Sequence, residues 1–432
     1  MNAEERRNLL REVQLAGNCS NPIRITGEMV NVATGEVGVN SLHISCKDRR
    51  AVICPSCSYT YKADAWILVS TGLLGGKGTP EEVRTHPRLF VTLTAPAFGA
   101  VHTITSRGAC VNRAKSVPRE SGGPTCRHGR SRTCRQRHPE NSAELGRPLC
   151  VECFDYEGAV LWNAHASKLW NNTVQTIRRT LAQVQGLGQR NLKLVAQIHY
   201  LKVAEMQRRG LIHFHAILRA DGSESVDVDP PTWLTSESLA SAVNRAARTS
   251  SAVGLDGRTI RWGQRFTVQD LGQTEGDTTK VPSYVAKYAT KTTDGTRELA
   301  RPFHSRRQIR LLIDDPHAQA LALTAWDLDL SPTWAPLRLR NHAHTFGFTG
   351  QLITKSRDYS TTFAALRGAR AEFMSGRNIG DPLEGTFHYQ GRGYDDPKAT
   401  QLAELFFSMH RELRMEGAEA RRKAATDASE PS

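Results

Sequence analysis

The chain has 432 residues, 39% of them hydrophobic, so it can bury one or more cores and is not a disordered protein. Lys and Arg outnumber Asp and Glu by 57 to 43, and the net charge of +14 favours a polyanionic partner, most simply nucleic acid, over a merely solvated basic surface. No apolar stretch is long enough to span a bilayer, and the N-terminus lacks a signal-peptide pattern, so we expect a cytoplasmic protein with no membrane partner.

We expect three regions along the chain. Residues 1–84 are expected to form a cysteine-rich zinc module of short strands and turns, and residues 85–300 the core of the protein. Residues 301–432 form a C-terminal region that contacts DNA through its arginines or supports the sheet, with a polar tail from about residue 416.

The core opens with an alternating, β-branched strand, "LFVTLTAP" (89–96), followed by a basic insertion at about 97–156 that is rich in Gly, Pro and Ser. The patterns that follow are those of a helix, two strands, a helix, a strand and a helix, at 157–185, 192–206, 211–220, 235–250, 264–271 and 281–293. This order predicts an α+β fold with an antiparallel central sheet of the split βαβ type and zinc-binding insertions.

Eight of the nine cysteines fall into two clusters, each containing a C-x-x-C pair. The first cluster consists of Cys19, Cys46, Cys54 and Cys57, and the second of Cys126, Cys134, Cys150 and Cys153. His128 and His138 lie within the second cluster as substitute ligands, and Cys110 is left over. In a cytoplasmic chain such clusters favour metal over disulfides, so we expect two structural Zn²⁺ sites; a group of ordinary buried cysteines is the alternative.

The strand "LIHFHAILRA" places two histidines on either side of Phe214. Strand alternation sends the imidazoles of His213 and His215 to one face and Phe214 to the other, together with Ile212 and Ala216. Glu205 lies across the predicted hairpin and offers a carboxylate as a third ligand, for which His199 is a rival. Two imidazoles and a carboxylate with open positions suit Mg²⁺ or Mn²⁺ bound next to a phosphate, although a pair of structural histidines is the plainer interpretation.

The segment "VPSYVAKYATKTT" places two tyrosines four residues apart, each followed by a lysine. On a helix, Tyr284 and Tyr288 share one face, with Lys287 and Lys291 nearby. Taken alone, this pattern is most simply a packing stripe.

Taken together, the motifs resemble those of a known enzyme family. "FVTLT", "HFH" and "YVAKYATK" occur in the order of the three motifs of the HUH endonucleases, which are rolling-circle replication initiators and related relaxases and transposases. "CPSC", "EMQRRGLIHFHAILR" and "TKSRDYSTTF" further resemble the replication initiators of actinobacterial plasmids and integrative elements.

This resemblance implies a metal-dependent, site-specific single-strand DNA endonuclease. A divalent ion on Glu205, His213 and His215 would polarise the scissile phosphate. Tyr284 is the preferred first nucleophile and would leave a 5′-phosphotyrosine link and a free 3′-hydroxyl, after which Tyr288 would cut the new junction. Lys287 and Lys291 would neutralise the phosphate or favour the phenolate, and Thr92 and Thr94 would shape the site.

The resemblance also implies partners and leaves alternatives open. The substrate is single-stranded or supercoiled origin DNA, and a host helicase and polymerase are expected because the chain has no G-x-x-x-x-G-K-[ST] motif. The same chemistry would serve a relaxase or a transposase. In a third interpretation the chain is a non-catalytic, zinc-stabilised DNA-binding regulator.

Overall fold

The computed structural model describes residues 3–31, 37–104, 110, 125–223, 228–272, 281–283, 285, 301–375 and 383–427. The chain falls into two compact units. The first contains residues 1–65 together with 362–432, and the second contains residues 66–361. The two units therefore divide the chain differently from the three consecutive regions expected from the sequence, because the C-terminal segment folds with the N-terminal one.

The first unit is built on a three-stranded antiparallel sheet in the order β10-β1-β2. The strands span Ile23–Asn31 (β1), Val37–Ile44 (β2) and Leu383–Arg392 (β10). The helices are α1 (Ala3–Leu15), α9 (Phe363–Ser375), α10 (Pro397–Asp427) and the start of α2 (Pro55–Leu74), which carries the chain into the second unit. Val13 of α1 is buried against Ala399 and Ala403 of α10, which fixes the two ends of the chain in one unit.

The second unit is organised around a five-stranded sheet in the order β8-β3-β5-β4-β9, in which every pairing is antiparallel. The strands span Arg88–Thr94 (β3), Gln197–Met206 (β4), Ile212–Asp221 (β5), Phe266–Asp270 (β8) and Ile353–Lys355 (β9). β5 is therefore the central strand, between β3 and β4. Mixed α/β composition and antiparallel sheets confirm the fold class at this level.

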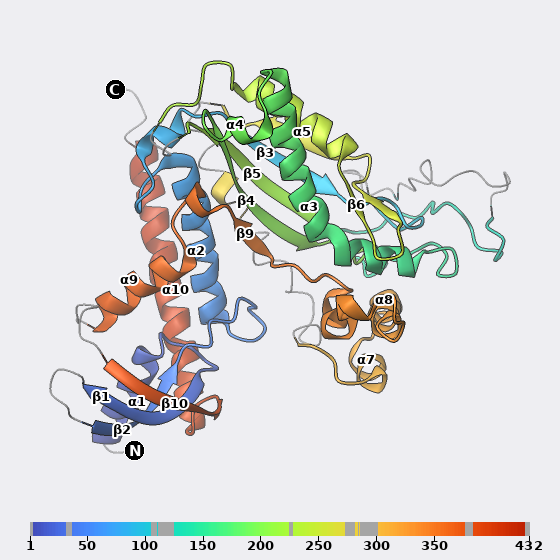
Figure 1. Cartoon of the computed structure of the whole chain (residues 1–432). Coiled ribbons are helices and arrows are strands. Elements are labelled where there is room, and N and C mark those ends of the chain that lie inside the picture. The colour runs from blue at the N-terminus through green and yellow to red at the C-terminus, as the bar shows by residue number, and fades with distance from the viewer. Residues whose placement is uncertain are drawn as a thin grey trace. The chain divides into compact units, whose positions relative to one another are not determined.

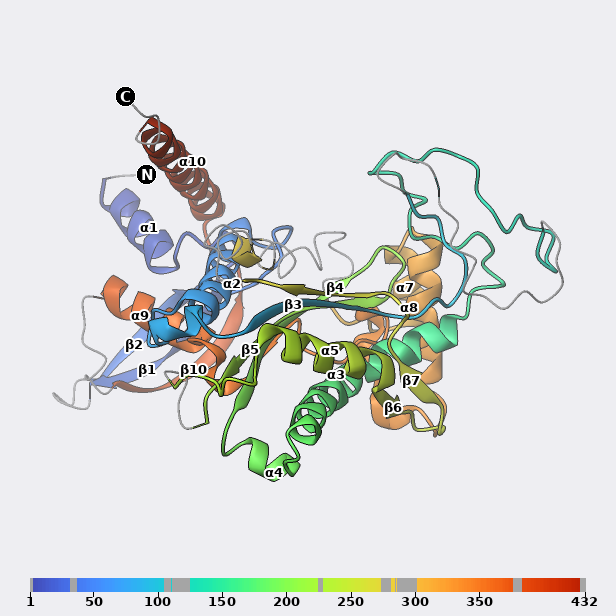
Figure 2. The same cartoon turned by 90° about the horizontal axis from the view of Figure 1, so that it is seen from above.

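Two helices cover one face of this sheet, as Figures 1 and 2 show. The long helix α3 (Tyr156–Val184) begins at Asp155, whose side chain accepts from the backbone N–H of Gly158, and α5 (Ser236–Thr249) begins at Thr235 with a reciprocal capping box. Trp162 and Trp170 of α3 are buried and pack with Phe214 of β5 in the main core. Both tryptophans lie on the buried side of the helix that the sequence pattern predicts at 157–185.

Smaller elements complete the second unit. They are the 3₁₀ helices η1 (Glu81–Arg84), η4 (Ala335–Leu337), η5 (Leu339–Thr345) and η6 (Arg357–Tyr359), the helices α4 (Gln189–Leu192), α7 (Arg306–Leu312) and α8 (Pro316–Leu328), and the strands β6 (Ser251–Val253) and β7 (Thr259–Arg261). The described part of the insertion between β3 and α3 contains turns and isolated bridges but no helix or strand.

The structure differs from two expectations for local elements. The N-terminal region contains the helices α1 and α2 in addition to short strands. The apolar and polar residues of α2 show no clear one-sided pattern. Pro55 occupies its first helical position, where proline is well tolerated. The first strand of the hairpin begins at Gln197 instead of residue 192, because residues 189–192 form one helical turn that precedes it.

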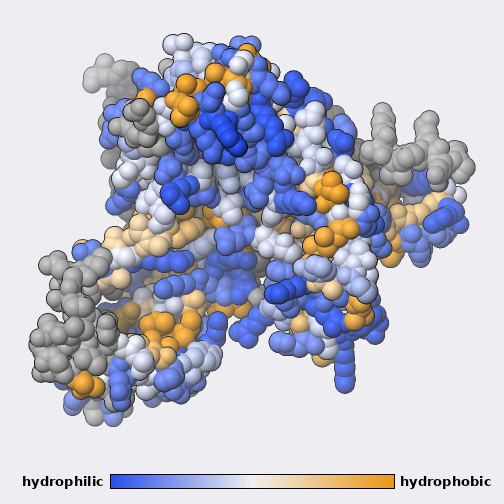
Figure 3. Space-filling model, viewed as in Figure 1, coloured by the Kyte–Doolittle hydropathy of each residue, from blue (hydrophilic) through white to orange (hydrophobic). Residues whose placement is uncertain are grey.

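The surface is largely hydrophilic on the face shown in Figure 3, with small and separate apolar spots. Among the described residues, none of the helices combines the length and the apolar character needed to cross a lipid bilayer.

Candidate functional site

The central hairpin brings together one carboxylate and two imidazoles. Glu205 on β4 stands directly opposite His213 on β5, and His215 follows two residues along the same face. Oε2 of Glu205 lies 3.1 Å from Nε2 of His215, and the two imidazole rings stack with centroids 4.5 Å apart. One ligand atom from each residue lies within 4.8 Å of the other two, so the three can hold one ion.

The neighbouring strand and the hairpin turn hold these side chains in place. The hydroxyl of Thr92 on β3 lies 3.2 Å from Nδ1 of His215, which leaves Nε2 directed towards Glu205. The amide of Gln207 lies 2.8 Å from Nδ1 of His213, and Arg209 donates to the other end of that amide at 2.9 Å. Gln207 and Arg209 were not singled out from the sequence, where their only signal is their place in the "EMQRRG" turn.

The electrostatics keep the site in a form that can bind a cation. Burial, followed by charge interactions with His215 and Arg209, lowers the pKa of His213 to about 3, so the imidazole of His213 is neutral at pH 7. Nε2 of His213 is buried and has no hydrogen-bond partner among the described residues. A buried polar atom without a partner is unfavourable, and a bound ion would satisfy it. Two ring nitrogens and one carboxylate oxygen together can hold a divalent metal ion.

The turn between β4 and β5 determines this register. Gly210 has a φ of 73°, and its N–H donates to the carbonyl of Gln207 at 2.8 Å. The fully buried Asn163 of α3 donates to the carbonyl of Gly210 and accepts from the N–H of Ile212. Helix α3 therefore fixes the point at which β5 begins. No sequence motif marks Asn163, because an isolated Asn within a helix has many possible roles.

The four residues of the tyrosine segment, Tyr284, Tyr288, Lys287 and Lys291, lie outside the described residues. Beside them, Val285 is buried and Ser283 accepts from the indole N–H of Trp66 at 3.3 Å. The expected roles of the tyrosines and lysines stay predictions.

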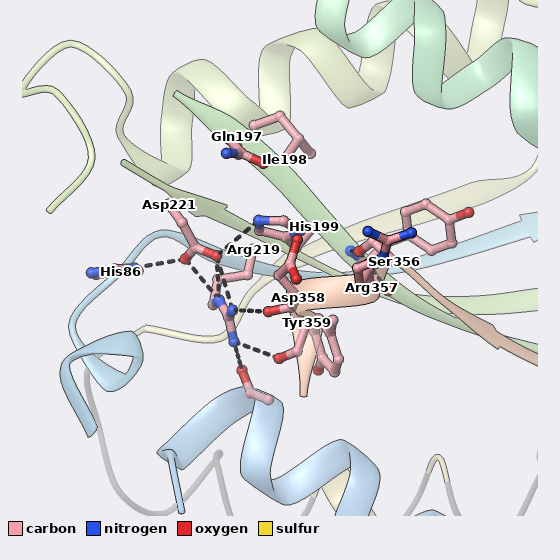
Figure 4. A network of polar contacts seen from close by, with 12 residues as sticks. His86, Gln197, Ile198, His199, Arg219, Asp221, Ser356, Arg357, Asp358 and Tyr359 are labelled. Carbon is pink, nitrogen blue, oxygen red and sulfur yellow. Dashed lines mark hydrogen bonds and ion pairs between the residues drawn. The ribbon is translucent and has the colours of Figure 1, made fainter. Parts of the chain in front are cut away.

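The rival metal ligand, His199, lies in a different network, shown in Figure 4. Its Nε2 is 3.6 Å from Oδ2 of Asp221, and the other oxygen of that carboxylate, Oδ1, lies 2.7 Å from Nδ1 of His86. Arg219 binds the same carboxylate through Nε and Nη2 and donates to the backbone carbonyls of Gly72 and Tyr359. His199 pairs in register with Arg219, so it is too far along β4 to join Glu205 and is not part of the site.

The first cysteine cluster comes together in the first unit. Cys19, Cys46, Cys54 and Cys57 form one group, in which three of the four residues are buried. Sγ of Cys19 and Sγ of Cys54 are 3.7 Å apart, close to the edge of about 3.8 Å expected for a zinc tetrahedron with Zn–S bonds of about 2.3 Å. Hydrogen bonds among the four thiols lower the pKa of Cys19 and Cys54 and raise the pKa of Cys46 and Cys57, so two of the four are favoured as the thiolates that metals bind.

The second cluster differs from the predicted set in one member. Cys126, Cys150 and Cys153 lie together, but their fourth companion is His128, and Cys134 is not in the group. Cys134 instead joins His138, His102 and the left-over Cys110 in a further group. The sequence pattern failed here because the spacings between partners are irregular, and cysteine identity alone does not show which loops meet. None of the nine cysteines forms a disulfide.

The chain is a strongly basic, mixed α/β protein with antiparallel sheets, and its described residues form four groups of potential metal ligands. Comparison with known proteins identifies it further. Residues 5–407 match the family described as "Replication initiator protein, pSAM2" (RepSA), so the chain belongs to this family of replication initiators.

A curated relative supports the same assignment. The replication initiator protein of Streptomyces ambofaciens is 37% identical to this chain over 389 residues, which cover 84% of this chain and 79% of the relative. No solved structure matches the chain.

Proposed function

We propose that this replication initiator cuts one DNA strand at an origin and starts rolling-circle replication as an HUH-type endonuclease. The observation that carries the proposal is the group formed by Glu205, His213 and His215 on adjoining strands. In a purely structural pair of histidines we would expect each buried ring nitrogen to have a hydrogen-bond partner. Nε2 of His213, which lies next to the Glu205 carboxylate, has none in the described part of the chain.

The proposed reaction transfers the phosphate at the cut site from the 3′-oxygen of DNA to a tyrosine of the protein. Glu205, His213 and His215 would hold a Mg²⁺ or Mn²⁺ ion, which supplies Lewis-acid polarisation of the scissile phosphate when bound. The phenolic oxygen of Tyr284 forms a bond to phosphorus while the bond between phosphorus and the 3′-oxygen breaks, and the proton that the phenol loses is balanced by the one that the 3′-oxygen gains. The products are a 5′-phosphotyrosine and a free 3′-hydroxyl. Lys287 and Lys291 neutralise the phosphate, and Tyr288 cuts the regenerated junction before the strand is rejoined.

The proposal extends to binding partners. The excess of basic residues, nine against one acid between Arg107 and Arg137, suits contacts to DNA phosphates. The cysteine group of the first unit would hold a structural Zn²⁺ ion, and a host helicase and polymerase would supply strand separation and synthesis. A relaxase or transposase would use the same chemistry. The test therefore uses the replication origin as its DNA substrate.

The full-length protein is incubated with labelled single-stranded origin DNA and Mn²⁺ or Mg²⁺ and analysed on a denaturing gel. We expect a covalent protein–DNA band that is lost without the ion and in Tyr284→Phe/Tyr288→Phe, and reduced at least about a hundredfold in His215→Ala because a metal ligand is removed. Each single tyrosine variant shows which phenol attacks first.

Matched controls separate chemistry from folding. Tyr389 is an exposed tyrosine of β10 and His304 an exposed histidine, so Tyr389→Phe and His304→Ala should give the wild-type band. If wild-type protein binds the DNA and forms no adduct with either ion, the endonuclease proposal is wrong. A non-catalytic DNA-binding regulator would then be the better description.

A further inference from the structure

The described part of the insertion between β3 and α3 has almost no hydrophobic interior. Between residues 125 and 153 only His138, Gly146, Pro148 and Cys150 are buried, and the segment contains no helix or strand. A segment with so little apolar burial cannot offset the entropy of ordering its backbone. The described residues nevertheless make defined contacts, which centre on two groups of cysteine and histidine side chains.

One of these two groups in the insertion contains two histidines and two cysteines: His102, Cys110, Cys134 and His138. Nε2 of His138 lies 3.2 Å from Nδ1 of His102 and 3.4 Å from Sγ of Cys134, and Sγ of Cys110 lies 3.9 Å from Nδ1 of His102. These separations are those of neighbouring ligands around one tetrahedral ion, whose bonds are about 2.0 Å to nitrogen and about 2.3 Å to sulfur.

The surroundings of this group orient its ligands. Nδ1 of the buried His138 contacts a carboxylate oxygen of Glu144 at 3.0 Å, so Nε2 is the ring atom directed into the group. A carboxylate on the outer nitrogen is the usual support of a zinc-binding histidine. The backbone N–H of Cys110 donates to the carbonyl of Gln136 at 3.1 Å, which holds the two halves of the group together.

The second group contains Cys126, His128, Cys150 and Cys153. Nδ1 of His128 lies 3.3 Å from Sγ of Cys153 and 3.6 Å from Sγ of Cys150. The Cys126–His128 pair sits on a tight turn, in which the N–H of Gly129, with a φ of 72°, donates to the carbonyl of Cys126. Such turns present two ligands to one ion and leave the backbone outside.

We propose that this insertion is a binuclear zinc module in which two ions are held by interleaved pairs of ligands. In chain order the pairs are 102 and 110, 126 and 128, 134 and 138, and 150 and 153. The first and third pairs hold one ion with two nitrogens and two sulfurs, and the second and fourth hold the other with one nitrogen and three sulfurs. Tetrahedral sets of this composition select zinc.

The interleaved order has a structural consequence. Each ion closes a loop that contains a ligand pair of the other ion, so the two ions replace a hydrophobic core in ordering the segment. The exposed arginines of the module, Arg127, Arg130, Arg135 and Arg137, are thereby fixed on a rigid scaffold. The proposal goes beyond the proposed function. Neither strand cutting nor the structural zinc of the first unit requires two further ions in the insertion.

Zinc content of the full-length protein, measured by native mass spectrometry, tests the arrangement. With the cysteine group of the first unit also filled, the three Cys/His groups predict three ions per wild-type chain. We expect Cys110→Ala and Cys150→Ala each to lose one ion relative to wild type and the double variant to lose two. Cys110→His keeps a ligand at that position and should keep the full complement.

Two results would overturn the proposal. One is that Cys110→Ala loses no zinc, as expected if Cys126, Cys134, Cys150 and Cys153 formed a single site. The other is that the double variant loses no more zinc than either single variant. His304→Ala, which removes an exposed histidine outside the groups, is the matched control and should keep all ions. Cobalt substitution adds a check, because the thiolate charge-transfer band should weaken more in Cys150→Ala than in Cys110→His.

Discussion

Lys202 of β4 is buried on the helix-covered side of the sheet. Its ammonium lies 4.1 Å from the ring centroid of Phe214 and 5.9 Å from that of Trp170. Burial lowers its pKa to about 7, well below the ordinary value of 10.5. The unfolded chain therefore binds more protons than the folded one between about pH 7 and 10.5, so the wild type gains stability as pH rises through this window.

We expect Lys202→Met to stabilise the protein by about 1–4 kcal/mol at pH 6, where the lysine is charged in both states, and by much less near pH 10. Urea unfolding at several pH values measures the difference. Lys193→Met removes an exposed lysine and should leave the pH dependence unchanged. Equal effects of Lys202→Met at both pH values would show that packing and not charge burial dominates.

The pair of Arg219 and Asp221 also makes stability rise with pH, but in the acidic range. Although desolvation of the fully buried Asp221 opposes ionisation, hydrogen bonds from His86 and Arg219 lower its pKa below the ordinary value of 3.8. A carboxyl with a lowered pKa contributes stability that is full above its unfolded pKa and is lost as pH falls through its folded pKa.

We expect Arg219→Met to destabilise the protein by about 3–5 kcal/mol at pH 7, because it leaves the Asp221 carboxylate buried without its partner. Arg219→Met/Asp221→Leu should recover part of that loss. Thermal unfolding measures both. The control Arg306→Met removes an exposed ion pair with Asp327 and should change stability by less than about 1 kcal/mol. If Arg219→Met and Arg306→Met lowered the stability by similar amounts, burial of the Asp221 carboxylate would not explain the effect of Arg219→Met.

Part of the candidate site is predictable from single residues. The alternation of "HFH" correctly places His213 and His215 opposite Phe214, and the short hairpin correctly brings Glu205 beside them. Gln207, Arg209 and Asn163 escape prediction because their positions depend on where the turn and α3 meet. Cys134 is assigned to the wrong group for the same reason: the sequence shows which residues can bind metal, while the folding of the loops decides which of them meet.

At the scale of elements, the turn at Gly210 holds Glu205 and His213 in register. A Cβ on Gly210 would lie 2.1 Å from Cδ1 of Leu321, and the positive φ adds backbone strain. We expect Gly210→Ala to destabilise the protein by about 1–3 kcal/mol and to lower the yield of the covalent DNA adduct by at least about tenfold.

The matched control for this turn is Gly188→Ala. Gly188 precedes α4 with a φ of −69° and has open space around it, so alanine should be tolerated. Unfolding curves and adduct gels are recorded for both variants. Normal adduct yield from Gly210→Ala would mean that the register of the hairpin does not control the site.

Elements with a strong local pattern are predictable, and those stabilised by distant segments are not. Helix α3 and the central hairpin follow directly from their periodicity. Pairing of β1 with β10 joins residues separated by more than three hundred positions, for example Ile23 with Arg392. The sequence of neither strand indicates which strand it pairs with, so the discontinuous first unit cannot be predicted from the sequence.

At the scale of the whole molecule, the net charge of +14 should govern affinity for DNA. Each phosphate that a basic side chain neutralises releases condensed counterions, so the logarithm of the binding constant falls linearly with the logarithm of salt concentration. The insertion between β3 and α3, which we propose binds two zinc ions, presents four exposed arginines: Arg127, Arg130, Arg135 and Arg137. If they bind phosphates, replacing them changes the slope of this line as well as the affinity.

We expect the fourfold Arg→Gln variant of the module to lower the magnitude of the salt slope by about 2–4, which is about 0.7–0.9 for each phosphate that is no longer neutralised. A second fourfold variant removes the same amount of charge elsewhere, at Lys62, Lys77, Arg190 and Lys193. Fluorescence anisotropy with labelled origin DNA at several salt concentrations measures both. Equal slopes in the two variants would show that DNA responds to total charge and not to the module. A change confined to the module variant would locate a DNA-binding surface on the zinc-bound insertion, because total charge is matched.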